Sequence, residues 1–390
     1  MLTSTGYRKA SAGILVLLFV AGLLVGGLLI FFVEYQQVSK INSQVSILQD
    51  QISDLRGFQN ATTQNITILQ NGTSLTDIYS NVRKSVVLVQ GETSDGGVQG
   101  SGFVYTFAGR TIILTNYHVV EGTTSLSVTF SNGHGYSASV LGKDPYSDLA
   151  VVSVSSDAPA SEFKPLTIVS SSSLSVGEPV IAIGNPYGLV GSLTTGVVSA
   201  TGRTITEDTA GGYAIANIIQ TSTPINPGNS GGPLLNAVGN VVGITTAIVS
   251  DSQGLGFAIP SDTILREVSA LISTGSYNFH SYLGVTGTDM DYTTAQQSSA
   301  SVTYGWRIAS ISAGGPSAGK LEIKDIIIAM GLQGSNGTVT NQQTIKNNDD
   351  LASYLEENTL PGDNLVMTVA RGDSQTSVTV VLGTRPAPTA

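Results

Sequence analysis

Short runs rich in β-branched residues fill the chain from about residue 74 to 260, with glycine, asparagine, proline and serine between them. This pattern is typical of an all-β barrel or sandwich, because each run suits one strand and each break supplies turn residues. Asn132-Gly133 is a hairpin signal between two of these runs. The sequence therefore predicts a mainly β body. Its expected strands are 85–90, 111–115, 125–130, 136–141, 149–154 and 179–183.

The apolar period changes at the end of this body. Five apolar residues between Ile264 and Ile272 fall on one helical face and Gly275 follows, which predicts a helix over 261–274 and a domain boundary there. The remaining residues have their own core pattern. Strands are expected at 306–311, 323–330, 365–370 and 377–382, and a helix at 349–357. Arg371-Gly-Asp-Ser374 is interpreted as a hairpin turn and not as an adhesion signal.

An apolar run of 21 residues, Gly13 to Val33, precedes the β body. It exceeds the usual length of a signal-peptide core and predicts an uncleaved transmembrane anchor. Arg8 and Lys9 before it and Glu34 after it place the N-terminus, residues 1–12, in the cytoplasm and the rest outside. A cleaved signal peptide is the alternative, although the exit from the run lacks an A-x-A-like site.

Residues 34–73 are expected to form a short coiled-coil stalk and a linker. Val38, Ile41, Val45, Leu48, Ile52 and Leu55 alternate at steps of three and four, as in a heptad seam. A single amphipathic helix is the alternative, because the seam is shorter than three to four heptads. Glycosylation sequons at Asn60, Asn65 and Asn71 fit an exposed linker on the outer face.

Composition excludes several classes of protein. With 17 basic against 27 acidic residues, the formal net charge of -10 disfavours binding of nucleic acid, whose phosphates need a basic surface. A multi-span transporter is disfavoured because the sequence has only one apolar run of membrane-spanning length. The absence of cysteine excludes disulfides, a thiolate nucleophile and a Cys-type zinc site.

Three residues of the β body could perform nucleophilic catalysis. Ser230 lies in Asn226-Pro-Gly-Asn-Ser-Gly-Gly-Pro233, whose small residues permit a sharp turn close to a substrate. A serine hydroxyl needs a base, and His118 follows an apolar strand directly. Asp148 precedes another strand and can orient the imidazole. His134 and His280, the other two histidines, are expected to be solvated loop residues.

The order His, Asp, Ser, with spacings of 30 and 82 positions, is that of the chymotrypsin-like arrangement. Five segments, TNYHVV, DPYSDLAVV, IGNPYGLVGSLTTGVVSATGR, INPGNSGGPLLN and GLGFAIPSD, occur in the order found in the HtrA (Deg) family. From about residue 74 to its end the chain resembles these trypsin-like serine proteases with a C-terminal PDZ domain. The resemblance implies a chymotrypsin-like double β-barrel over 74–275 and a PDZ domain with a tail over 276–390.

The resemblance also implies roles for further residues. The N–H groups of Gly228 and Ser230 would form an oxyanion hole, and Ile225, Ile248 and Val249 would line the pocket for a small apolar side chain. Residues 184–191 match a loop that reorders on activation, and Arg203 matches a position that relays the signal in some members, with a solvated arginine as the alternative. Thr245 and Thr246 are assigned to the substrate-pairing strand and not to catalysis. Ser222-Thr223-Pro224 departs from the family's usual residues.

In the C-terminal region Tyr282-Leu283-Gly284-Val285 resembles the carboxylate-binding loop of the family's PDZ domains. Such a domain would bind C-terminal peptides by adding them to a sheet edge. Lys324 stands before Asp325 where the family usually has glycine.

The expected function is therefore a membrane-anchored, extracytoplasmic serine endopeptidase in protein quality control. It would cleave unfolded or damaged proteins after small apolar residues, without cofactor or metal, and form a homotrimer. The alternatives are a catalytically silent chaperone module that tethers misfolded proteins through its PDZ domain, and a regulatory protease with one membrane substrate.

Overall fold

The computed structural model describes residues 74–185, 191–207, 213–226, 228–246 and 255–387, together with Leu17 and Phe19. The expected anchor, apart from those two residues, and the expected stalk with its sequons lie outside the described residues. Within the described ranges no helix has the length and apolar character needed to cross a membrane. The chain divides into two compact units, residues 1–69 and 70–390, and the description below concerns the second.

The first six strands form a closed barrel in the order β1-β2-β3-β6-β5-β4. Alternate side chains point inward along each strand, so that Val87, Val89, Val104 and Ile113 are fully buried in its core. The strands are β1 Val86–Thr93, β2 Gly96–Phe107, β3 Arg110–Asn116, β4 Ser125–Thr129, β5 Gly135–Asp144 and β6 Leu149–Val154. A one-turn helix, α3 (Tyr117–Val120), follows β3, and a 3₁₀ turn, η1 (Ala160–Glu162), follows the barrel.

The next six strands close a second barrel in the order β10-β11-β12-β9-β8-β7. Its core contains Val180, Ala182, Leu234 and Ala258, all fully buried. The strands are β7 Pro179–Gly184, β8 Ser192–Glu207, β9 Tyr213–Thr221, β10 Pro233–Asn236, β11 Val241–Thr246 and β12 Gly256–Pro260. The expected double barrel is therefore present, with an antiparallel ladder in each half.

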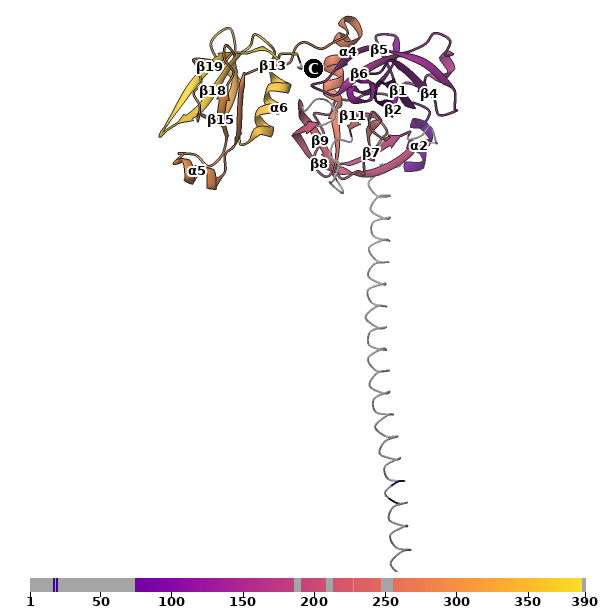
Figure 1. The fold of residues 1–390 in the computed structure, drawn as a ribbon, viewed down its shortest axis with the longest axis horizontal. Coiled ribbons are helices and arrows are strands. Elements are labelled where there is room, and N and C mark those ends of the chain that lie inside the picture. The colour runs from indigo at the N-terminus through magenta and orange to yellow at the C-terminus, as the bar shows by residue number, and fades with distance from the viewer. Residues whose placement is uncertain are drawn as a thin grey trace, which may run out of the picture. The chain divides into compact units, whose positions relative to one another are not determined.

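Two helices cover the junction of the barrels. Helix α2 (Leu75–Val82) begins at Ser74, whose hydroxyl accepts the N–H of Asp77 at 3.1 Å. Helix α4 (Ser261–Thr274) has the predicted bounds and ends at Gly275 with φ 81°, a left-handed conformation that glycine adopts without strain. Helix α4 lies beside β5 and β6 (Figure 1). Side chains of both helices and of strands in both barrels contribute to one hydrophobic core, which fixes the barrels against each other.

The C-terminal region forms a second hydrophobic core around a six-stranded sheet. The path β14-β15-β16-β18-β19 makes the sheet, β17 pairs with β16, and β13 pairs with β20. The elements are β13 Ser281–Tyr282, β14 Val285–Asp289, α5 Tyr292–Ser298, β15 Trp306–Ile311, β16 Ile326–Gln333, β17 Val339–Thr344, α6 Asn348–Asn358, β18 Asn364–Arg371, β19 Ser374–Val381 and β20 Gly383–Thr384. Arg371 pairs with Ser374, so the predicted hairpin turn is confirmed.

One strand of this sheet begins later than the sequence predicted. The expected strand at 323–330 is β16, Ile326–Gln333, because residues 322–325 form a turn in which the Asp325 carboxylate accepts the N–H of Glu322 at 2.8 Å. Lys324 in that turn has φ 79°, the left-handed conformation that favours glycine. This backbone conformation explains why glycine would suit the position that Lys324 occupies.

Candidate active site

His118 and Asp148 both come from the first barrel. His118 lies on α3 directly after β3, and Asp148 ends the loop between β5 and β6. The Nδ1 atom of His118 lies 3.1 Å from Oδ1 and 3.0 Å from Oδ2 of Asp148. A carboxylate accepts a hydrogen bond from a protonated Nδ1, which leaves Nε2 of the neutral ring as the basic nitrogen. The arrangement is that of a general base with its orienting carboxylate.

The Asp148 carboxylate is fully buried and has further hydrogen bonds. The backbone N–H of His118 donates to Oδ1 at 3.0 Å, and the Thr246 hydroxyl donates to Oδ2 at 3.0 Å. The backbone of Asp148 has φ 51°, and its carbonyl accepts hydrogen bonds from Tyr117 N and Asn116 Nδ2. Such an unfavourable conformation persists only when neighbouring contacts hold it, so these bonds fix where the carboxylate lies.

Thr246 makes a contact that the sequence did not indicate, while its assignment to the substrate-pairing strand stays a prediction. It is the last residue of β11, in the second barrel, and its hydroxyl contacts Asp148 in the first. The sequence could not indicate this contact, because 98 positions separate the two residues. The neighbouring Thr245 donates instead to the carbonyls of Asn229 and Gly232, and so supports the turn around Ser230.

Ser230 lies on the tight turn that precedes β10, where it is 6 % exposed. Gly231 has φ 84°, and a Cβ atom there would lie 2.0 Å from the carbonyl oxygen of Ser101. Only glycine fits a backbone that is both left-handed and this close to a neighbouring strand. Gly228 likewise has φ 95°. The predicted small residues are therefore required by the turn.

Ser101, on β2, connects the Ser230 turn to the first barrel. Its N–H donates to the Ser230 carbonyl at 2.7 Å, and its hydroxyl donates to the Gly228 carbonyl at 2.6 Å. The same hydroxyl accepts the N–H of Asn185 at 2.8 Å. Ser101 could not be predicted as part of the site, since a serine in a glycine-rich strand has no distinctive signal. The use of the Gly228 and Ser230 N–H groups as an oxyanion hole stays a prediction.

The other predicted residues are only partly described. Ile225 is half-buried and packs against the core of the second barrel, whereas Ile248 and Val249 lie outside the described residues. Of the expected activation loop, residues 186–190 lie outside them too. Arg203 donates to Asp349 on α6 at 3.0 Å and to Gln220 at 3.2 Å, so it is an ion-paired residue and not simply solvated. Its regulatory role stays a prediction.

The two remaining histidines differ from each other. His134 has a 63 % exposed side chain, as expected, and pairs with Glu162. His280, by contrast, is buried: its Nε2 lies 2.6 Å from Asp144 Oδ2 and its Nδ1 3.2 Å from Glu356 Oε2. The expectation of a solvated His280 was wrong, because the connector that carries it packs between charged side chains distant in the sequence.

The expected carboxylate-binding loop joins β13 to β14. Gly284 in this loop has φ 78°, and its carbonyl accepts the N–H of Ser312 at 2.9 Å. The Ser317 hydroxyl donates to the Leu283 carbonyl at 2.6 Å, and Tyr282 Oη lies 2.8 Å from Ser312 Oγ. These contacts hold the loop in one conformation. Its binding of a carboxylate stays a prediction.

The chain has two closed six-stranded barrels, with a histidine and an aspartate in one barrel and a serine in the other. This combination defines a trypsin-like serine peptidase. Comparison with known proteins agrees, since the trypsin-like peptidase domain family matches residues 100–244. The chloroplastic Protease Do-like 1 of Arabidopsis thaliana is 36 % identical over 302 residues, 74 % of this chain and 64 % of its own. The Serine protease Do-like HtrA of Lactococcus lactis subsp. cremoris is 38 % identical over 60 % of each chain.

A probable periplasmic serine endoprotease of Chlamydia trachomatis, described as DegP-like, is 40 % identical over 60 % of this chain. The chain spans 45 to 64 % of the length of these curated relatives. Among solved structures, the HtrA-type protease AlgW with a tripeptide is 30 % identical with a TM-score of 0.63, over 81 % of this chain and 99 % of its own. The chain belongs to the HtrA-type family of trypsin-like serine proteases.

The Thr246 contact gives a testable prediction. Thr246→Val removes the hydroxyl and keeps the shape, so Asp148 loses one donor and orients His118 less well. We expect kcat to fall about tenfold with KM changed less than about twofold, because the loss affects the base more than substrate binding. Thr359→Val is the matched control, since the Thr359 hydroxyl is also buried and donates to a carbonyl. Thr359 belongs to the C-terminal sheet region and is far from Asp148 in the sequence. An equal loss of kcat in both variants would contradict the role.

Proposed function

We propose that the protein is a serine endopeptidase that hydrolyses peptide bonds through an acyl-enzyme on Ser230. The observation that carries this proposal is the pairing of His118 Nδ1 with the buried Asp148 at 3.0 Å. His118 takes the proton of Ser230 as the hydroxyl attacks the peptide carbonyl, and later gives it to the leaving amine. Water then hydrolyses the ester by the same route and restores the free hydroxyl.

The oxyanion of the tetrahedral intermediate would be held by the N–H groups of Gly228 and Ser230, each worth about 3 kcal/mol of transition-state stabilisation. Support comes from the turn itself, whose carbonyls at Gly228, Asn229 and Ser230 are each engaged by a hydroxyl or N–H donor. A turn held at several carbonyls keeps its N–H groups in fixed directions.

The proposed substrates are unfolded or damaged proteins, cleaved after small apolar residues. The segment from Gln220 to Pro227 has no acidic side chain that could pair with lysine or arginine, and Ile225 gives this wall an apolar face. Mapping the cleavage sites in an unfolded protein such as casein tests this specificity. Cleavage mainly after lysine or arginine would contradict it.

The C-terminal region is proposed to be a PDZ domain that binds C-terminal peptides. Strand β14 stands at the end of the sheet path among the described residues, and the loop before it is ordered by Ser312 and Ser317. A peptide could extend the sheet along β14 while the loop N–H groups hold its carboxylate. An anchor at residues 13–33, an extracytoplasmic location and a homotrimer complete the proposal, supported by the apolar run, the heptad pattern and the family.

A fluorophosphonate probe tests the catalytic proposal on the full-length protein. We expect covalent labelling of Ser230 in the wild type and none in Ser230→Ala. Absence of labelling, with or without unfolded protein and C-terminal peptides, would overturn the proposal and favour a catalytically silent binding module.

A further inference from the structure

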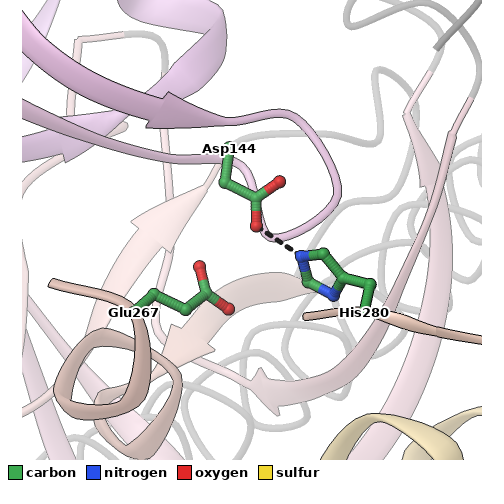
Figure 2. A group of neighbouring side chains, drawn as sticks. All are labelled: Asp144, Glu267 and His280. Carbon is green, nitrogen blue, oxygen red and sulfur yellow. Dashed lines mark hydrogen bonds and ion pairs between the residues drawn. The ribbon is translucent and has the colours of Figure 1, made fainter. Parts of the chain in front are cut away.

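A buried cluster of ionisable side chains lies beside the loop that carries Asp148 and is not part of the triad. Asp144 ends β5 directly before that loop, Glu267 belongs to α4, and His280 to the connector before β13. The three side chains are between 0 and 4 % exposed and point toward one another (Figure 2). Buried charges are costly unless they are paired and hydrogen-bonded, so the hydrogens in this cluster can be assigned from its contacts.

The hydrogen of the Ser147 hydroxyl limits how the cluster is protonated. Ser147 Oγ lies 2.9 Å from Asp144 Oδ2 and 2.6 Å from Glu267 Oε2. A hydroxyl has one hydrogen and can donate to only one of these carboxyl groups. The other contact requires a hydrogen on the carboxyl group itself.

Glu267 is the group that carries this hydrogen. Asp144 already accepts two hydrogen bonds, from His280 Nε2 at 2.6 Å and from the Tyr146 N–H at 3.0 Å. Glu267 Oε1 accepts from Arg266 at 2.9 Å, which leaves Oε2 to donate to Ser147. The chain of donors then runs from Glu267 to Ser147 to Asp144.

The balance of charge agrees with this assignment. Both ring nitrogens of His280 face carboxylates, so His280 is a cation, and Arg266 pairs with Glu356 as well as Glu267. Arg266 and His280, the two cations in direct contact with these carboxyl groups, are thus already paired with Glu356 and Asp144. Burial and the nearby Asp144 raise the pKa of Glu267 to about 8.

The other groups facing the cluster act on His280, Arg266, Asp144 and Glu356. Burial lowers the pKa of His280, but its hydrogen bonds to Asp144 and Glu356 outweigh burial and raise it to about 10. The ring of Tyr277 lies against Arg266 and His280, and Arg385, a third cation, lies over the ring of Tyr146. The charge of Arg385 acts on the Asp144 and Glu356 carboxylates.

A metal ion fits this site less well than a proton. Asp144, Glu267 and His280 each place one ligand atom within 4.8 Å of the others. However, His280 donates to Asp144, and Arg266 donates to Glu267. The two carboxyl groups that would bind such an ion are therefore already in contact with cationic side chains.

We propose that protonated Glu267 is a positioning residue for the catalytic Asp148. Its carboxyl hydrogen holds Ser147, Ser147 holds Asp144, and Asp144 in turn caps the N–H of Tyr146, so that the loop ending at Asp148 keeps its conformation. This inference rests on the proposed peptidase activity. Loss of the proton at alkaline pH breaks one contact to Ser147 and adds an unbalanced charge, which displaces Asp148 from His118.

The test compares kcat and KM of the full-length wild type, Glu267→Gln and Glu267→Ala on labelled casein from pH 6 to 10. We expect wild-type kcat to fall about tenfold between pH 7 and 9.5 with KM changed less than about twofold. Glu267→Gln rescues the contact, because its amide N–H donates to Ser147 at every pH. It should stay within about threefold of wild type at pH 7 and lose the alkaline fall, whereas Glu267→Ala should lose about tenfold in kcat already at pH 7.

Glu178→Gln is the matched control, since Glu178 is exposed, and it should keep the wild-type pH profile. An alkaline fall that is the same in Glu267→Gln and wild type, or a wild type without a fall up to pH 9.5, would overturn the inference. If Glu267→Ala does not fold, the comparison of Glu267→Gln with wild type decides alone. Fluorophosphonate labelling of the wild type at pH 7 separates the two proposals. Absence of labelling would contradict the peptidase activity, whereas the role of Glu267 is tested only by the pH profiles.

Discussion

Asp148→Asn is expected to lower kcat about 10⁴-fold while leaving the fold intact. The asparagine oxygen can still accept the His118 N–H, which places its amide group opposite Nδ1 of the ring. An amide donor there stabilises the tautomer with a hydrogen on Nε2, and that nitrogen can no longer take the proton from Ser230. The change would be measured as casein hydrolysis and as the rate of fluorophosphonate labelling.

Asp95→Asn is the control for this variant, because Asp95 is an exposed residue of the same barrel. It should hydrolyse casein at the wild-type rate. Thermal unfolding within about 3 °C of wild type would show that Asp148→Asn remains folded, since about 1 kcal/mol shifts the midpoint by a few degrees in a domain of this size. Retention of more than a tenth of the wild-type kcat would exclude Asp148 as the orienting carboxylate.

His280→Ala is expected to destabilise the folded protein by about 3 to 5 kcal/mol, because it leaves the buried Asp144 carboxylate and the partly buried Glu356 carboxylate without their shared cation. The pKa of His280 is raised in the folded state to about 10 from its usual 6.5. The folded protein therefore holds the proton more tightly, and the stabilisation is complete below pH 6.5 and lost as the pH rises toward 10. The difference in unfolding free energy between wild type and His280→Ala should shrink over that interval.

Urea unfolding at pH 6, 8 and 9.5 measures this difference. His134→Ala is the matched control, since His134 also pairs with a glutamate but has a 63 % exposed side chain, and it should cost less than about 1 kcal/mol. A His280→Ala variant as stable as His134→Ala, or a difference that grows with pH, would contradict the paired, cationic state of His280.

Local patterns in the sequence predicted much of the fold. The strands at 149–154 and 306–311 and the helix at 261–274 have the predicted bounds, because hydrophobic period and turn residues act within one element. Strand β2 was not predicted, since its glycines give no β-branched run, although they permit close contact such as that of Gly100 with the Ser230 turn. Register and partners of the strands depend on the barrel as a whole.

The proposed catalytic residues could be chosen from the sequence because their chemistry limits the choice. A nucleophilic serine in a glycine-rich turn needs a histidine, and the chain has only three. The environment of His280 could not be predicted in this way, because nothing near it in the sequence indicates the burial and the two carboxylates that make it a cation.

The sequence alone thus determined the mainly β class and the boundaries of many elements, and it indicated His118, Asp148 and Ser230 as the proposed triad, because these follow from local periodicity, turn chemistry and residue type. The tertiary structure alone decided that Thr246 contacts Asp148, that Ser101 holds the Ser230 turn and that Glu267 shares Ser147 with Asp144. These contacts join residues 98 to 127 positions apart, and hydrogen bonds between them form only when the barrels and α4 are packed together.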